Sequence, residues 1–247
     1  MTPTLPIIFA PGMMCDGRLF AQQIASIERY RPVMVADLSR DETIEAIAAR
    51  LLAAAPPRFY LAGLSMGGIV ALEVFRQDRT RVAGLALLDT TPLADAPEKQ
   101  PVREDQIARV RAGALAQVMA EEMKPAYLAA PARCNAALLL EIRLMAEALG
   151  PVVFERQSRA LMARRDNRDL LPAIACPTEV VCGEDDTLCP PQLHSDMAAR
   201  IRGARLTILP ACGHLSSMER PAEVTGILER GLLNAETSLK ENFAHAH

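Results

Sequence analysis

The chain has 247 residues, of which 50% are apolar and 23% are charged, and its formal net charge at pH 7 is −3. This length allows one sizeable hydrophobic core, and the small negative charge provides no basic field for nucleic acid or for an anionic membrane. No apolar run approaches the roughly 20 residues of a membrane span, and residues 1–6 lack the pattern of a signal peptide, so a cytoplasmic location is expected.

Apolar runs alternate with helical patterns along most of the chain, which is typical of a parallel sheet covered by helices on both faces. The predicted strands are residues 6–10, 32–37, 58–64, 82–89, 177–182 and 205–209. The predicted helices are residues 20–29, 41–54, 68–75, 192–201 and 221–233, with Asp41 as an N-cap. A parallel sheet of about six strands with right-handed crossovers would follow, in an α/β fold.

Residues 93–171 show no convincing strand, and their helical patterns are interrupted by proline and glycine. We interpret this stretch as a cap of about four short helices, inserted after the fourth strand. Residues 1–92 and 172–247 would then form the core, with 93–171 as the cap. The polar segment 234–247 is expected to fray, and its histidines, His245 and His247, to have no catalytic role.

The most informative motif is Gly63-Leu64-Ser65-Met66-Gly67, between a predicted buried strand and a predicted helix. A Gly-x-Ser-x-Gly in this context describes a nucleophile elbow, in which a strained turn holds the serine hydroxyl above the edge of the sheet. The glycines are needed because a Cβ there would collide with the neighbouring strand and helix. Ser65 is therefore the predicted nucleophile.

A serine needs a base to take its proton, and His214 directly follows the last predicted strand. Gly213 would let the loop turn the imidazole across the carboxyl edge of the sheet, so His214 is the predicted base. His194 falls within a predicted helix and is expected to be a solvated surface residue.

The carboxylate that orients the base is expected after the penultimate strand, in residues 182–187. Asp186 is favoured because it lies furthest from the strand and near Pro190, and Asp185 is the main alternative. Asp89 is an outside candidate, for which we favour a role in ending its strand by binding backbone amides.

Backbone N–H groups must stabilise the oxyanion of the transition state. Met66 N–H and Met13 N–H are the predicted donors, and Met14 is predicted to bind substrate beside them at the entrance. Met119, Met123, Met145 and Met162 of the cap are candidates for a flexible apolar wall. The cysteines near these positions, Cys15, Cys182, Cys189 and Cys212, are interpreted as reduced apolar filler rather than as reactive thiols.

These motifs together resemble the α/β-hydrolase superfamily, in particular its small helical-capped branch of esterases and carbon–carbon hydrolases. Residues 63–68 look like the elbow of that family, residues 183–190 like its Gly-x-x-Asp-x-x-x-Pro acid loop, and residues 213–214 with 219–221 like its histidine loop. The acid-loop match supports Asp186 over Asp185. The chain departs from the family where Pro11-Gly12 replaces His-Gly, and where no room remains before Pro6 for a leading antiparallel hairpin.

The resemblance implies a serine hydrolase that cleaves the ester of a small or medium apolar molecule, without metal or organic cofactor. Hydrolysis of a carbon–carbon bond or of a lactone by the same triad is the alternative within the enzyme class. A ligand receptor that keeps the fold without turnover is the alternative outside it. An esterase or thioesterase acting on a carrier protein, through Arg156, Arg159, Arg164 and Arg165, is a further hypothesis. The oligomeric state stays open.

Overall fold

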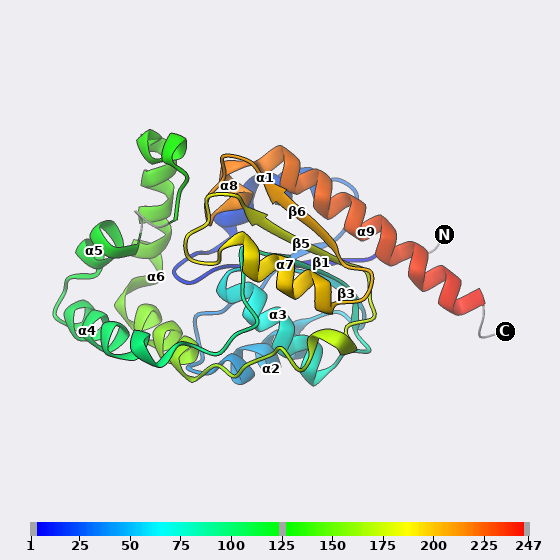
Figure 1. Ribbon diagram of the computed structural model, residues 1–247, viewed down its shortest axis with the longest axis horizontal. Coiled ribbons are helices and arrows are strands. Elements are labelled where there is room, and N and C mark those ends of the chain that lie inside the picture. The colour runs from blue at the N-terminus through cyan, green and yellow to red at the C-terminus, as the bar shows by residue number, and fades with distance from the viewer. Residues whose placement is uncertain (1–3, 124–126, 245–247) are drawn as a thin grey trace.

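A central parallel sheet organises the computed structural model, which describes residues 4–123 and 127–244 (Figure 1). Its six strands lie in the order β2-β1-β3-β4-β5-β6, and every neighbouring pair is parallel. The strands are β1 Ile7–Ala10, β2 Val33–Val35, β3 Phe59–Leu64, β4 Val82–Leu88, β5 Thr178–Gly183 and β6 Arg205–Leu209. The predicted α/β fold is confirmed. The central strands β3 and β4 are buried along their whole length, as expected for a sheet covered on both faces.

Two groups of helices pack against this sheet. The core helices are α1 Ala21–Ile27, α2 Ile44–Ala54, α3 Met66–Gln77, α7 Pro191–Arg200, α8 Ser216–Glu219 and α9 Pro221–Ala244. Helix α3 packs on β1, β3 and β4 and is flanked by α2, whereas α9 packs on β4 and β5 and is flanked by α1. Figure 1 shows these two pairs on opposite sides of the sheet. Helix α7 lies against β5 and β6.

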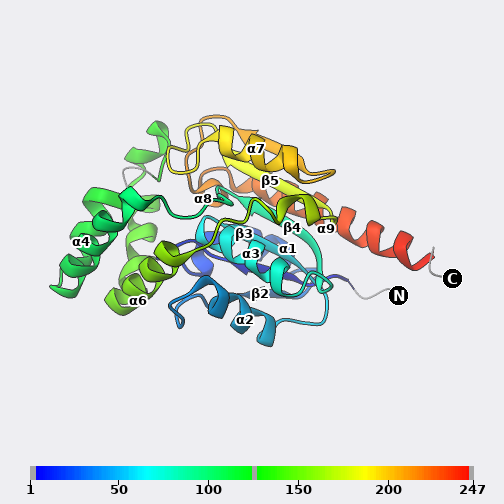
Figure 2. The same cartoon turned by 60° about the horizontal axis from the view of Figure 1, so that its bottom comes forward.

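The chain between β4 and β5 is helical and lies beyond one end of the sheet (Figure 2). It contains α4 Gln100–Arg111, α5 Leu115–Val118 and α6 Ala136–Ala163, and α6 is two helices joined across a kink at Gly150, where φ is 78°. The remaining short helices are η1 Gly17–Phe20, η2 Pro97–Lys99, η3 Met119–Met123, η5 Ala130–Cys134 and η6 Leu171–Ala173. The boundaries of a cap domain at residues 93 and 171 stay a prediction.

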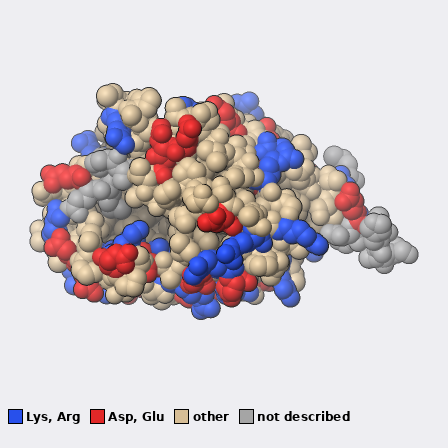
Figure 3. Space-filling model, in the orientation of Figure 1, with Lys and Arg blue, Asp and Glu red and all other residues tan. Residues whose placement is uncertain are grey.

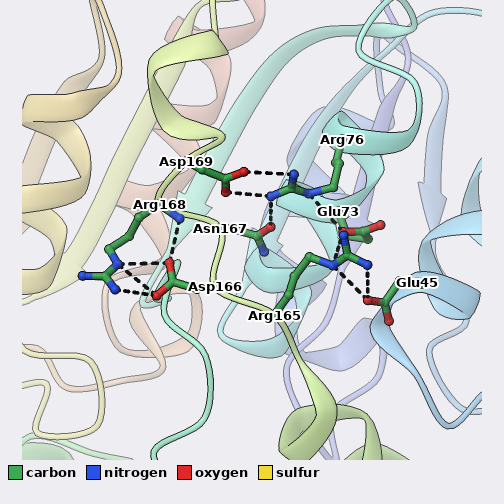
Figure 4. A network of polar contacts seen from close by, with 8 residues as sticks. All are labelled: Glu45, Glu73, Arg76, Arg165, Asp166, Asn167, Arg168 and Asp169. Atoms are coloured by element: carbon green, nitrogen blue, oxygen red, sulfur yellow. Dashed lines mark hydrogen bonds and ion pairs between the residues drawn. The ribbon is translucent and has the colours of Figure 1, made fainter.

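A network of ion pairs anchors the segment that leads from α6 back to the core (Figure 4). Arg165 pairs with Glu45 of α2 at 3.0 Å, and Asp169 pairs with Arg76 of α3 at 2.9 Å. The Arg76 guanidinium also donates to the side chain of Asn167 at 2.9 Å. The end of the inserted segment is therefore attached directly to the helix that follows the elbow.

Two expectations about helix ends are wrong. Helix α2 is capped by Thr43, whose hydroxyl accepts a hydrogen bond from the Ala46 N–H at 3.1 Å, whereas the Asp41 carboxylate pairs with Arg50. Helix α9 does not fray after residue 233 but continues to Ala244 and protrudes from the body of the molecule (Figure 1). A long-range ion pair between Glu236 and Arg31, at 2.9 Å, holds this extension.

His245 and His247, for which no catalytic role is expected, lie outside the described residues. Within the described ranges no helix is both long enough and apolar enough to cross a bilayer.

The glycines of the elbow generate a stability prediction. A Cβ on Gly67 would lie 1.8 Å from the Ala10 carbonyl oxygen, so Gly67→Ala should destabilise the fold by about 3 kcal/mol or more. Gly226 of α9 is the matched control, because a Cβ there meets nothing within 4 Å. Gly226→Ala should stabilise the protein by about 0.5–1 kcal/mol through helix propensity. Urea unfolding measures both, and equal midpoints for the two variants would contradict the packing argument.

Candidate active site

Ser65 lies on a strained turn between β3 and α3. Its φ of 55° and ψ of −115° fall outside the regions that non-glycine residues normally occupy. Four hydrogen bonds hold the turn. Ser65 N–H donates to the Leu88 carbonyl at 2.9 Å, and the Ser65 carbonyl accepts from the Thr90 hydroxyl at 2.7 Å and from the N–H groups of Gly68 and Ile69 at 3.0 and 3.2 Å. The local geometry is that of a nucleophile elbow, as the Gly-x-Ser-x-Gly pattern predicts.

The structure brings three of the predicted residues into one chain of hydrogen bonds. The Ser65 Oγ lies 2.9 Å from His214 Nε2, and His214 Nδ1 lies 2.8 Å from Asp186 Oδ2. Asp186 and His214 are 2% and 3% exposed, whereas the alternative acid, Asp185, is on the surface. The other Asp186 oxygen accepts from two backbone N–H groups, of Leu188 and Cys189, at 2.9 Å each, so the carboxylate is fixed in place.

The surroundings of His214 favour its charged form. Burial alone would lower the pKa of this imidazole, but the hydrogen bond to Asp186 and the negative charge of Asp186 outweigh burial and raise the pKa above 6.5. Glu219 adds a weaker negative charge nearby. His214 is therefore a stronger base than an unperturbed imidazole.

Asp89 binds backbone amides at the end of β4, which confirms the role favoured for it. Its two oxygens accept from Gly183 N–H and from Ser216 N–H, each at 3.1 Å. These donors belong to the loop that carries Asp186 and to the loop that carries His214. Burial raises the pKa of Asp89 to about 8, so at neutral pH we assign the negative charge beside His214 to Asp186. Asp89 thus ties the acid loop and the histidine loop to the centre of the sheet.

The expectation that His194 is a solvated surface residue is wrong. His194 is completely buried, and its Nε2 accepts a hydrogen bond from the Thr90 N–H at 2.9 Å. Its Nδ1 lies 3.3 Å from the Pro190 carbonyl and therefore carries the proton. The Thr90 hydroxyl in turn donates a hydrogen bond to the Ser65 carbonyl, so His194 is connected through Thr90 to the main chain of the elbow.

The predicted oxyanion donors follow the carboxyl ends of β1 and β3: Met13 lies in the loop after β1, and Met66 is the first residue of α3. Met66 opens helix α3, where the first N–H groups have no partner within the helix. Within the described residues no group accepts from the Met13 N–H, whereas the Met14 N–H donates to Gln157 of α6 at 2.8 Å. Met13 N–H and Met66 N–H are therefore available to a ligand, and Met14 N–H is not.

A cavity of about 370 Å³ opens beside Ser65 and His214. Its wall includes Met13 but neither Met14 nor Met66, both of which are buried with 1% exposure. The assignment of Met14 to substrate binding stays a prediction, without support from this cavity. The expected apolar wall of cap methionines is also absent from the lining: Met119, Met145 and Met162 pack elsewhere, and the Met123 side chain lies outside the described residues. Apolar contacts instead come from Leu64, Ile69, Leu161 and Leu215.

Two of the cysteines, Cys15 and Cys189, line the cavity. Burial raises the pKa of Cys15 to about 12 and that of Cys189 higher still, so both thiols stay protonated and unreactive. Cys189, Asp186 and His214 offer donor atoms within 4.8 Å of one another, a spacing that could suit a metal ion. However, His214 already uses both nitrogens, and a protonated thiol is a poor ligand.

Comparison with known proteins agrees with this geometry. Residues 9–227 match the sequence model described as "Alpha/beta hydrolase family", and the chain belongs to that family. A pimeloyl-[acyl-carrier protein] methyl ester esterase of Aromatoleum aromaticum is 26% identical, covering 77% of this chain and 80% of that protein. A putative carbamate hydrolase RutD of Yersinia enterocolitica is 22% identical over 96% of this chain and 92% of its own length.

Solved structures extend the comparison. A thermophilic esterase of Thermogutta terrifontis, with malate bound, superposes with a TM-score of 0.86 at 30% identity, over 94% of this chain and 91% of that chain. An enol-lactonase of Burkholderia xenovorans shares the fold, with a TM-score of 0.83 at 22% identity over 93% and 92% of the two chains. The protein is thus a hydrolase of the α/β-hydrolase family.

The sequence reasoning missed Thr90, His194 as a support, and the cationic residues Lys99 and Arg103 of the cavity wall. Lys99 and Arg103 are four residues apart at the start of a helix, a spacing that places them on one helix face. This spacing could have predicted that the two positive charges lie side by side. Thr90 and His194 are about a hundred residues apart, and no local pattern connects them.

Burial of His194 yields a pH prediction. Burial lowers its pKa from 6.5 to about 4, so between these values the unfolded state binds more protons than the folded state. The free energy of unfolding should therefore fall on acidification through this window, by about 3 kcal/mol from this residue. His194→Gln keeps an acceptor for the Thr90 N–H but does not titrate. On acidification through the same window, the free energy of unfolding of this variant should therefore fall by less than that of the wild type.

His214→Gln provides the control of opposite sign. The raised pKa of His214 stabilises the fold below pH 6.5, so removing it should steepen the loss of stability on acidification. Urea unfolding between pH 4 and 7 measures both effects. Parallel curves for wild type and His194→Gln would refute the buried, neutral state of His194.

Proposed function

We propose that the protein hydrolyses carboxylic esters of small or medium-sized molecules through an acyl-enzyme formed on Ser65. The observation that carries this proposal is the continuous hydrogen-bonded chain from Ser65 through His214 to Asp186. Acyl transfer requires a nucleophile within reach of a base, and a base oriented by a carboxylate. Ser65, His214 and Asp186 meet these two requirements in that order.

The proposed reaction has two stages. Ser65 Oγ attacks the ester carbonyl while His214 Nε2 takes the hydroxyl proton, and Asp186 stabilises the imidazolium that forms. The carbonyl oxygen, now negative, accepts hydrogen bonds from Met66 N–H and Met13 N–H. The carbon–oxygen bond of the ester breaks, and His214 gives its proton to the departing alcohol. Water then attacks the acyl-enzyme with His214 as base, which releases the acid and restores Ser65.

The relatives support the reaction class. The esterases of Aromatoleum and Thermogutta share 26% and 30% identity with this chain and are named for ester cleavage. The receptor hypothesis is disfavoured because Ser65, His214 and Asp186 are all present and in contact. Arg156 and Arg159 bind groups of this chain, the Ser39 carbonyl and Glu155. The carrier-protein hypothesis stays a prediction, and one relative is named as an esterase of a pimeloyl-[acyl-carrier protein] methyl ester.

Labelling with a fluorophosphonate tests the identity of the nucleophile. Intact-mass spectrometry should find one phosphonyl adduct on the wild type and none on Ser65→Ala, which should also lose ester turnover by about 10³-fold or more. Ser195→Ala is the matched control, because this hydroxyl donates to the Pro191 carbonyl on α7, away from the site. An unchanged adduct on Ser65→Ala would contradict the assignment.

The pH dependence of kcat/KM tests the pair of His214 and Asp186. Activity requires neutral His214, so the rate should rise with pH with a midpoint above 6.5. Asp186→Asn should lower kcat by about 10⁴-fold and move the midpoint to lower pH, because the carboxylate that raises the pKa is gone. Asp185→Asn should change neither. A profile that responds to Asp185 and not to Asp186 would reverse the assignment of the acid.

A further inference from the structure

The segment after β4 contributes a cationic wall to the cavity that holds Ser65. Lys99, Arg103 and Arg164 all line this cavity, together with one acid, Glu98. In the view of Figure 3 the surface is hollowed between the helical insertion and the core, and Lys or Arg atoms lie at the edge of the hollow. Lys99 is exposed, Arg103 is half-buried and Arg164 is buried, and positive charge on the wall of a cavity favours a ligand with negative charge.

The two arginines share one carboxylate. Asp95, whose side chain is 0% exposed, pairs with Arg103 Nε at 2.7 Å and with Arg164 Nη1 at 2.8 Å. The other N–H groups of Arg164 donate to backbone carbonyls, including those of Leu93 at 2.9 Å and Leu161 at 3.2 Å. Arg164 is therefore fully engaged, and its role is to hold Asp95 and Arg103 in place.

Arg103 keeps one side of its guanidinium unused. Its Nε and Nη2 donate to Asp95, and within the described residues nothing accepts from its Nη1. No ion pair with a described residue engages the Lys99 ammonium, although Glu98 is its neighbour in the chain. Three cations thus face two acids, Asp95 and Glu98, and the wall has an excess of positive charge.

The cations line the same cavity as Ser65 and His214. The positive charges of Arg164 and Lys99 oppose the larger effect of burial on the pKa of the Cys189 thiol. The backbone N–H of Cys189 donates to Asp186. The positive charge of Arg103 likewise opposes the effect of burial on the pKa of Tyr127. The ring centre of Tyr127 lies 5.9 Å from that of His214. A molecule that reaches Ser65 through this cavity therefore passes within the field of these cations.

We propose that Arg103 and Lys99 bind a carboxylate of the substrate, so that the preferred ester carries an anionic group a few carbons from the scissile carbonyl. This inference rests on the proposed function of Ser65. The Nη1–H of Arg103 and the ammonium of Lys99 donate to the carboxylate oxygens, in charge-assisted hydrogen bonds. The apolar wall of Leu64, Ile69, Leu161 and Leu215 contacts the carbon chain between the two ends.

Matched pairs of esters test the preference. Monoethyl glutarate and monoethyl adipate are compared with their isosteric neutral half-amides, in which only the charge is removed. The kcat/KM for the anionic ester should exceed that for the amide by about tenfold or more at low salt, and the ratio should shrink with added NaCl. A second pair, O-acetyl-3-hydroxybutanoate and its amide, places the charge on the departing alcohol and shows which end of the ester faces the wall.

Removal or reversal of the positive charges locates the subsite. Lys99→Glu should reduce the ratio of anionic to neutral turnover towards one or below, and Arg103→Gln, which keeps a donor for Asp95, should reduce it as well. Arg202→Glu is the control, because it makes the same charge change at an exposed residue after α7 that does not line the cavity. It should leave the ratio as in the wild type.

The possible outcomes separate this inference from the proposed function. Equal kcat/KM for the anionic and neutral members of both pairs, with Ser65 still labelled by fluorophosphonate, overturns the carboxylate subsite and leaves the esterase proposal standing. A preference that survives Lys99→Glu and Arg103→Gln overturns the assignment to these residues. Absence of ester turnover and of labelling overturns the proposed function and the inference with it.

Discussion

The hydrogen bond between Ser65 Oγ and His214 Nε2 is the interaction on which the rest of this structure depends. It joins residues 149 positions apart in the chain, so it exists only if two loops are held at the same edge of the sheet. Parallel strands provide that edge, because their carboxyl ends all point the same way. Asp89 and Thr90, which follow the central strand β4, then bind the acid loop, the histidine loop and the elbow.

Much of this support consists of buried polar groups that are satisfied by backbone partners. Asp89 and His194 are both fully buried, and each hydrogen-bonds to main-chain atoms of a loop near the site. Such networks cost free energy when a member is lost, because the remaining group stays desolvated without a partner. The same argument applies to Asp95 between its two arginines. The site is therefore rigid where it holds Ser65 and His214, and charged where it opens towards the helical insertion.

Local patterns predicted the parts of this arrangement that local physics determines. The elbow at Ser65 and the strand runs depend on glycine placement and apolar spacing, and the resemblance to a known family supported Asp186 over Asp185. The sequence could not predict the burial of His194, since that depends on Thr90 across the sheet edge. The C-terminal part of α9 forms an ion pair with a distant residue, Arg31, and the cap methionines Met119 and Met145 pack in the hydrophobic core instead of lining the cavity. These are tertiary effects, which periodicity does not encode.

Direct observation of the covalent intermediate tests the central claim most sharply. Rapid acid quench during turnover, followed by peptide mass spectrometry, should find the acyl group on the peptide that contains Ser65, with an amount that decays as substrate is exhausted. An acyl group found instead on Cys15 or Cys189, or sustained turnover with no acylated peptide at any quench time, would contradict the account.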